Sequence, residues 1–218
     1  MKTLANRKSI TVPAGENNIH GDLTIPPEAK GIVLFAHGSG SSRLSPRNTQ
    51  VALEINQAGI ATLLIDLLTK YEEAVDVSTA EFRFDIGLLA RRLMQATQWI
   101  IKNQATETLA IGYFGASTGA AAALIASARL PELAKAVVSR GGRPDLAGEY
   151  LSEVKAPTLL IVGGNDIDVL ELNRKALKEM TSEKKLAVVP GATHLFEELG
   201  KLEEVARLAI NWFSRYLR

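Results

Sequence analysis

Short apolar runs alternate along the chain with longer segments in which apolar residues recur at helical spacing. The later runs, such as Gly31–Ala36 and Thr158–Val162, are continuously apolar, as is typical of strands covered on both faces of a parallel sheet. The first two runs alternate more strongly and are flanked by prolines, which predicts an antiparallel hairpin at the sheet edge. The predicted strands are Ser9–Val12, Ile19–Ile25, Gly31–Ala36, Ile60–Ile65, Leu109–Phe114, Ala136–Ser139, Thr158–Val162 and Lys185–Val189.

Five segments between and after these strands carry an apolar stripe near 3.6-residue spacing. The predicted helices are Asn48–Ala58, Phe84–Gln104, Thr118–Leu130, Val169–Met180 and Leu202–Leu217. Strand–helix alternation over this length predicts the α/β class: a doubly wound, mostly parallel eight-stranded sheet with helices on both faces. Because no repeat or flexible linker interrupts the pattern, we expect a single domain over residues 1–218.

Composition narrows the range of partners. The formal net charge is +1 and basic residues are scattered, so neither nucleic acid nor an anionic membrane is expected as a partner. The absence of cysteine excludes disulfides, thiolate metal sites and a cysteine nucleophile. Met1–Lys8 lacks the apolar core of a signal peptide, and no apolar stretch reaches the roughly 20 residues of a membrane span. We therefore expect a cytoplasmic protein, with its oligomeric state left open.

The strongest chemical signal is a G-x-S-x-G sequence, Gly115-Ala116-Ser117-Thr118-Gly119, between a predicted strand and an alanine-rich predicted helix. In this setting a sharp turn presents the serine hydroxyl above the carboxyl edge of the sheet. The glycines allow close backbone approach, and the helix N-terminus directs N–H groups toward a developing anion. We therefore predict Ser117 as a nucleophile; the alternative is a packing turn with an idle serine.

A serine nucleophile needs a base, and the chain has three histidines. Only His194, in the loop after the last strand, follows Ser117 in the chain, as the Ser…Asp…His order requires; an ordinary surface histidine is the alternative. His20 lies in the predicted hairpin. His37 ends a strand, and that position suits either a structural role or a role in the loop that forms the oxyanion hole. Asp166 follows a strand and two glycines, so it is predicted to orient His194; Asp168 is the competitor, or an N-cap.

An oxyanion hole needs two preorganised N–H donors. The amide of Thr118 follows the nucleophile and is predicted to supply one. The other is expected from the loop His37–Ser42, where we favour the amide of Ser39 over Gly38 or Gly40. The same loop lacks the lysine of a phosphate-binding G-x-x-x-x-G-K-[ST] sequence, which disfavours nucleotide binding.

These segments resemble the α/β-hydrolase fold, and more closely the dienelactone-hydrolase-like branch of small, nearly capless serine hydrolases. The matching sequences are FAHGSGSS (35–42), GYFGASTGAAAAL (112–124), SRGGRPDLAG (139–148), PTLLIVGGND (157–166) and VPGATHLFEE (189–198). The resemblance implies hydrolysis of esters or lactones through an acyl-enzyme without a cofactor or metal. Dienelactone hydrolase itself uses a cysteine nucleophile, so serine at position 117 puts dienelactone in doubt as the substrate.

The length of the connections predicts an open cleft. Arg140–Pro157 has room for one short helix rather than a large lid, which favours small or short-chain esters. Residues 67–82 either narrow the mouth with Leu67, Leu68 and Tyr71 or form an ordinary connection.

Three arginines lie at the same predicted edge of the sheet: Arg43, Arg140 and Arg143. Such guanidinium groups bind a substrate carboxylate or pair with an internal acid such as Asp145, and we favour the internal pairing.

The sequence thus predicts a serine hydrolase acting on small esters or lactones. Two alternatives stay open: a non-catalytic ligand-binding protein on the same fold, and a triad enzyme acting on thioesters or carbon–carbon bonds.

Overall fold

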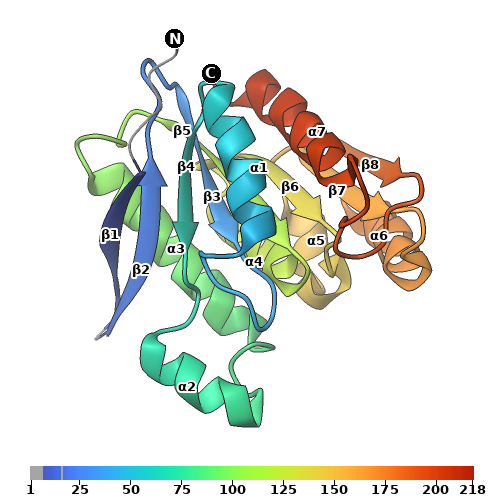
Figure 1. Cartoon of the computed structure of the whole chain (residues 1–218), viewed down its shortest axis with the longest axis horizontal. Coiled ribbons are helices and arrows are strands. Elements are labelled where there is room, and N and C mark those ends of the chain that lie inside the picture. The colour runs from blue at the N-terminus through green and yellow to red at the C-terminus, as the bar shows by residue number, and fades with distance from the viewer. Residues whose placement is uncertain (1–6, 16) are drawn as a thin grey trace.

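The computed structural model describes residues 7–15 and 17–218 (Figure 1). Residues 1–6, and with them most of the segment Met1–Lys8 discussed above, lie outside the described residues. The strands are β1 (Arg7–Ala14), β2 (Asn17–Thr24), β3 (Gly31–Ala36), β4 (Ala61–Ile65), β5 (Ala110–Ala116), β6 (Ala134–Arg140), β7 (Thr158–Gly163) and β8 (Lys184–Val189). They form one sheet in the order β1-β2-β4-β3-β5-β6-β7-β8.

The predicted strands and the edge hairpin are confirmed. No strand boundary differs from its predicted position by more than two residues, as for Asn17–Thr24 against the predicted Ile19–Ile25. β1 pairs antiparallel with β2, β2 pairs antiparallel with β4, and every pairing from β4 to β8 is parallel. The predicted fold class, a mostly parallel eight-stranded α/β sheet of the α/β-hydrolase type, is therefore correct.

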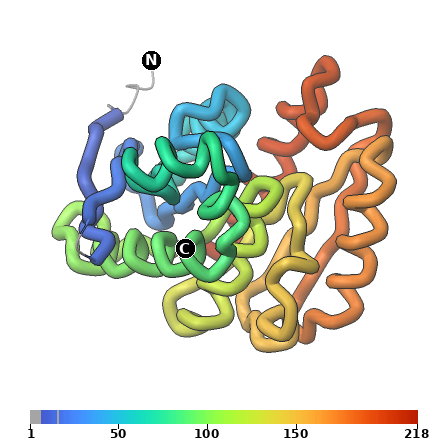
Figure 2. The backbone as a smooth tube through the Cα atoms, turned by 90° about the horizontal axis from the view of Figure 1, so that it is seen from below, coloured from blue at the N-terminus to red at the C-terminus, as the bar shows by residue number. Residues whose placement is uncertain are grey.

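Helices cover both faces of this sheet (Figures 1 and 2). The elements are α1 (Pro46–Gln57), α2 (Lys70–Thr79), α3 (Ile86–Lys102), α4 (Thr118–Arg129), the 3₁₀ turn η1 (Pro144–Ala147), α5 (Tyr150–Glu153), α6 (Ile167–Glu179) and α7 (Lys201–Tyr216). Alternate residues of β3 separate the two cores: Val33 and Phe35 pack with α1 and α7, whereas Ile32 and Leu34 pack with α3 and α4.

Two segments differ from expectation. Residues 67–82 contain a helix, α2, that the apolar pattern did not reveal; of its side chains only Asp76 is buried. A capping box holds its first turn, because Thr69 and Glu72 each accept a hydrogen bond from the other's backbone N–H. The connection Arg140–Pro157 holds two short helical turns, η1 and α5, rather than one.

The topology gathers the chemically interesting loops at one edge of the sheet. β3 lies between β4 and β5, so the chain leaves β3 toward one side and returns to its other side. Ligands of doubly wound sheets bind at this type of switch point, outside the carboxyl ends of the strands. The loops after β3, β5, β6, β7 and β8 all lie at that edge, and they carry every site residue predicted from the sequence.

Candidate active site

Ser117 occupies a strained turn between β5 and α4. Its φ of 51° and ψ of −121° are uncommon for a residue with a side chain and cost about 1–3 kcal/mol. Neighbouring backbone holds the turn: the N–H of Ser117 donates to the carbonyl of Arg140 at 3.2 Å, and the N–H of Arg143 donates to the carbonyl of Ser117 at 3.1 Å. The hydroxyl is thereby presented at the carboxyl edge, as the G-x-S-x-G sequence predicts.

The turn depends on backbone contacts that exclude side chains. A Cβ atom added to Gly119 would lie 2.3 Å from the carbonyl oxygen of Ala36 and 2.4 Å from that of His37. A Cβ atom at Gly115 would lie 2.4 Å from the Cα of Ala120. Both glycines are therefore required because the start of α4 packs directly against β5 and the end of β3.

Asp166 and His194 form a direct pair. The Nδ1–H of His194 donates to Oδ2 of Asp166 at 2.7 Å, and the carboxylate side chain is only 14% exposed. Asp166 is the N-cap residue of α6, but its side chain makes no capping hydrogen bond. The carboxylate is therefore free to accept the hydrogen bond from the imidazole. α6 begins at Ile167, two residues before the predicted start, which places the competitor Asp168 in the first turn of α6, exposed to solvent.

The loop after β6 connects the two halves of the site. Arg140 accepts the backbone hydrogen bond of Ser117, and a Cβ atom on the next residue, Gly141, would lie 3.5 Å from the His194 ring. No hydrogen bond joins the hydroxyl of Ser117 to the imidazole, although both residues belong to the described part of the chain. Such bonds are often long in ligand-free sites and shorten when substrate binds.

The two residues predicted to form an oxyanion hole contact each other. Oγ of Ser39 lies 3.0 Å from Oγ1 of Thr118, within hydrogen-bonding distance. Gly38 packs against Ser117, since a Cβ atom there would lie 3.0 Å from the Cβ of Ser117. Among the described residues, the backbone N–H groups of Ser39 and Thr118 have no acceptor. Two unpaired amides therefore lie beside the serine.

His37 has a structural role in the loop His37–Ser42. Its Nδ1–H donates to the carbonyl of Gly38 at 2.9 Å, and its Nε2 accepts from the N–H of Leu67 at 3.0 Å. Burial lowers the pKa of His37 below its ordinary value of 6.5, while the Gly38 bond and the charges of Asp66 and Glu73 oppose this shift. The neutral ring thus ties the loop to the segment after β4.

A family model described as the dienelactone hydrolase family matches residues 19–216 of the chain. The chain belongs to the dienelactone hydrolase family. It is 57% identical to a dienelactone hydrolase from Anabaena variabilis, with a TM-score of 0.98, covering 99% of this chain and 100% of that one. Est1E from Butyrivibrio proteoclasticus shares the fold at a TM-score of 0.79 and 16% identity, covering 95% of this chain and 98% of Est1E.

Two curated relatives come from Mycobacterium tuberculosis strains and bear the name "Putative phosphoribosyl transferase". Each is 55% identical over 210 residues, which make up 96% of this chain but 46% of the relative. This member of the dienelactone hydrolase family thus spans about half the length of the curated relatives it matches.

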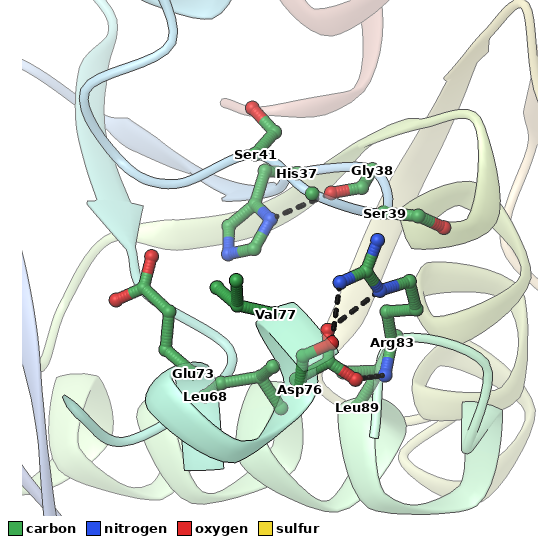
Figure 3. Close-up of a pocket in the computed structure, with 11 residues that line it drawn as sticks. His37, Gly38, Ser39, Ser41, Leu68, Glu73, Asp76, Val77, Arg83 and Leu89 are labelled. Atoms are coloured by element: carbon green, nitrogen blue, oxygen red, sulfur yellow. Dashed lines mark hydrogen bonds and ion pairs between the residues drawn. The ribbon is translucent and has the colours of Figure 1, made fainter. Parts of the chain in front are cut away.

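A pocket of about 100 Å³ lies beside the loop His37–Ser42 (Figure 3). The loop forms one wall, and α2 with the start of α3 forms the other; the lining residues are His37, Gly38, Ser39, Gly40, Ser41, Leu68, Glu73, Asp76, Val77, Arg83 and Leu89. An ion pair of 2.6 Å between Arg83 and Asp76 closes one end. Of the residues proposed to narrow the mouth, only Leu68 lines this pocket, because Leu67 is buried in the core and Tyr71 is 77% exposed.

Two of the three arginines predicted near the site have acidic partners. Arg43 pairs with Asp22 and Asp66, and Arg143 makes two hydrogen bonds to Asp145, at 2.9 and 2.7 Å. Both are engaged within the protein, as we favoured from the sequence. Among the described residues, Arg140 has no acidic partner.

Within residues 7–15 and 17–218, no group of three or more histidine, aspartate or glutamate side chains is placed to hold a metal ion. No helix in the same ranges combines the length and apolar character that crossing a bilayer requires.

Replacing Gly119 with alanine is expected to destabilise the protein by about 1–3 kcal/mol or more, because the new methyl group meets two carbonyl oxygens that cannot move independently. Gly87 is a matched control: it also occupies the second position of a helix, but an added Cβ there meets only flexible side-chain ends at 3.3 and 3.4 Å. Denaturant unfolding of Gly119→Ala and Gly87→Ala measures the difference. Equal stability of the two variants would contradict the tight turn.

The buried neutral His37 is expected to make stability depend on pH. Its pKa is lower in the folded than in the unfolded chain, so the unfolded chain takes up the proton first as pH falls below about 6.5. The contribution of neutral His37 to the free energy of unfolding is therefore complete above about pH 6.5. Below that pH it falls by at most about 1.4 kcal/mol per pH unit. We therefore expect the unfolding free energies of wild type and His37→Gln to differ at pH 7.5 and to converge at pH 5.0. A difference of the same size at both pH values would contradict the assignment.

Proposed function

We propose that this chain is a serine hydrolase that cleaves small carboxylic esters or lactones through an acyl-enzyme. The observation that carries the proposal is the 2.7 Å hydrogen bond between Asp166 and His194 at the edge where the strained Ser117 turn presents its hydroxyl. That bond fixes the tautomer with the proton on Nδ1, which leaves Nε2 of His194 free to accept a proton.

The proposed reaction uses each of these groups at a stated atom. Oγ of Ser117 attacks the ester carbonyl while Nε2 of His194 takes the hydroxyl proton, and Asp166 stabilises the resulting imidazolium. The amides of Ser39 and Thr118 donate to the oxyanion of the tetrahedral intermediate. His194 then protonates the departing alcohol, and a water molecule repeats the sequence on the acyl-enzyme to release the acid.

The size of the pocket in Figure 3 supports a preference for short groups. Its volume of about 100 Å³ is smaller than the roughly 150 Å³ cavity that accepts benzene, so it holds only a few carbon atoms. Leu68 and Leu89 give it apolar walls next to the oxyanion loop. We therefore assign it to the short acyl or alcohol part of the substrate.

The name of the mycobacterial relatives introduces phosphoribosyl transfer as another activity. It describes whole proteins in which the segment similar to this chain makes up 46%. The Asp166–His194 pair and the Ser117 turn favour acyl transfer for this chain, and we propose no phosphoribosyl transfer.

Substituting Ser117 with alanine should lower the kcat for p-nitrophenyl butyrate by about 10⁴–10⁶-fold, because the nucleophile is lost. Asp166→Asn should lower it by about 10⁴-fold, because the imidazole is then held in the wrong tautomer. Asp168→Asn is the matched control, two residues further along and exposed to solvent, and should retain activity. Steady-state hydrolysis and labelling of Ser117 by a fluorophosphonate probe provide the measurements.

Two results would refute the proposed reaction: full turnover by Ser117→Ala, or a folded wild-type protein that neither hydrolyses the ester nor reacts with the probe. The second result would favour a non-catalytic binding protein on this fold.

Enlarging the pocket should shift the preference toward longer acyl chains. Leu68→Ala removes three carbon atoms from the pocket wall, and each additional buried CH₂ of the substrate contributes about 0.8 kcal/mol, or about fourfold in kcat/KM. The ratio of kcat/KM for p-nitrophenyl hexanoate to that for the butyrate should rise about four- to tenfold. Leu53→Ala, on the exposed side of α1, is the control. An unchanged ratio in Leu68→Ala would contradict the assignment of this pocket to the substrate.

A further inference from the structure

The loop after β3 is fixed at both ends to two consecutive residues, Asp66 and Leu67, which follow β4. At the start of the loop, the N–H of Leu67 donates to Nε2 of His37 at 3.0 Å. At its end, the carboxylate of Asp66 accepts the backbone N–H of Arg43 at 2.9 Å and also pairs with the guanidinium. Asp66 is itself held, since its N–H donates to the carbonyl of His20 on β2 at 2.9 Å. The loop therefore lies between two anchors on one short segment.

The hydrogen bonds of His37 determine which ring nitrogen carries its proton. The backbone N–H of Leu67 can only donate, so Nε2 is an acceptor and is unprotonated. A neutral imidazole then has its proton on Nδ1, and this N–H donates to the carbonyl oxygen of Gly38 at 2.9 Å (Figure 3). Because His37 is buried, both hydrogen bonds are protected from water.

The carbonyl of Gly38 belongs to the same peptide bond as the backbone N–H of Ser39. This peptide bond is trans. In a planar trans peptide bond the carbonyl and the N–H point in opposite directions. A contact that fixes the Gly38 carbonyl therefore also fixes the direction of the Ser39 N–H.

Two donors hold this carbonyl. Besides the ring of His37, the N–H of Ser41 donates to it at 3.2 Å. The second bond closes a β-turn over Gly38–Ser41 with Gly40 at the third position, where its φ of 65° is typical of a type II turn. The Ser39 N–H accordingly points away from both donors, and it has no acceptor in the described part of the chain.

The same peptide bond lies against the Ser117 turn. A Cβ atom on Gly38 would lie 3.0 Å from Cβ and 3.7 Å from Oγ of Ser117. Oγ of Ser39 lies 3.0 Å from Oγ1 of Thr118. The residues on both sides of the peptide bond thus pack against Ser117 and the residue that follows it.

We propose that His37 is a positioning residue: by holding the Gly38 carbonyl, its Nδ1–H aims the Ser39 N–H at the carbonyl oxygen of the substrate. Asp66 supports this arrangement by fixing the other end of the loop. The inference rests on the proposed ester hydrolysis, in which the Ser39 N–H donates to the oxyanion. His37 itself touches neither the substrate nor a reacting atom.

Two substitutions of His37 separate its two hydrogen bonds. In His37→Asn, the side-chain amide nitrogen takes the place of Nδ1 and donates to the Gly38 carbonyl, but the Leu67 N–H loses its acceptor. In His37→Gln, the longer side chain places its amide oxygen near the Leu67 N–H, but the Gly38 carbonyl loses the ring donor. Each variant keeps one hydrogen bond and loses the other, so both should lower the Tm.

The two variants should differ in turnover. We expect His37→Gln to lower kcat for p-nitrophenyl butyrate about 10- to 100-fold and to change KM by less than about threefold, because the oxyanion bond forms in the transition state. His37→Asn should stay within about threefold of the wild-type kcat. Thr106→Val is the control for lost stability: it removes a buried hydrogen bond of 2.8 Å to the carbonyl of Ile100, before β5, and should keep the wild-type kcat.

A second pair of variants tests the other anchor of the loop with His37 intact. Asp66→Asn keeps an oxygen that accepts the backbone N–H of Arg43, whereas Asp66→Ala removes it. We expect kcat to fall about 5- to 10-fold in Asp66→Ala and to stay near the wild-type value in Asp66→Asn. Wild-type kcat in folded Asp66→Ala would overturn the role of this anchor.

A transition-state analogue gives a measurement that a loss of folded protein does not change. Oγ of Ser117 adds to the carbonyl carbon of 1,1,1-trifluorohexan-2-one, its proton passes to His194, and the former carbonyl oxygen becomes an oxyanion. The Ki of this ketone should rise in His37→Gln by about the factor by which kcat/KM falls, and should stay near the wild-type value in His37→Asn.

Two results would overturn the role of His37. One is a wild-type kcat and Ki in folded His37→Gln. The other is a loss of kcat in folded His37→Asn as large as the loss expected for His37→Gln, which would make His37 a structural residue only. This second result can be obtained even if His37→Gln does not fold. Absence of ester hydrolysis by wild type would instead refute the proposed function, and the inference would fall with it.

Discussion

The structure of the site depends on a single steric constraint, the direct contact between the first turn of α4 and the backbone at the end of β3. No side-chain atom fits between Gly119 and the carbonyl oxygens of Ala36 and His37. This contact places the Ser117 turn against the loop His37–Ser42, where Ser39 contacts Thr118 and Gly38 packs against Ser117. The positive φ of Ser117 is sustained because the last residue of β6, Arg140, accepts a hydrogen bond from its N–H, while Arg143 in the following loop donates one to its carbonyl.

The second half of the site is held by different means. Asp166 and His194 lie on loops after neighbouring parallel strands, and close packing of Gly163 against the carbonyl groups of Ala192 and Thr193 fixes the distance between those loops. The N-cap position of α6 leaves the Asp166 carboxylate free of helix capping. Backbone contacts therefore position both Ser117 and Asp166, while the imidazole of His194 has 37% of its side chain exposed and is less enclosed than the carboxylate.

The parts that could be predicted from the sequence are those determined by local pattern. Continuously apolar runs define buried strands, and the G-x-S-x-G sequence between a strand and a helix defines the turn. Helix α2 was missed because its stability comes from the Thr69–Glu72 capping box and from ion pairs of Glu72 and Asp76, not from an apolar stripe; the T-x-x-E sequence was the available signal. The partners of arginines depend on residues far away in sequence, so Asp22 and Asp66 could not be assigned to Arg43 in advance.

The same comparison of arginines sets Arg140 apart from Arg43, Arg92 and Arg143, because no described acid pairs with it. The chain supplies acids to Arg43, Arg92 and Arg143, including acids 20 or more residues away, so internal pairing is within reach of this fold. A methionine or leucine at position 140 would fill similar volume among Ala136, Val138 and the α1 side chains without a desolvated charge.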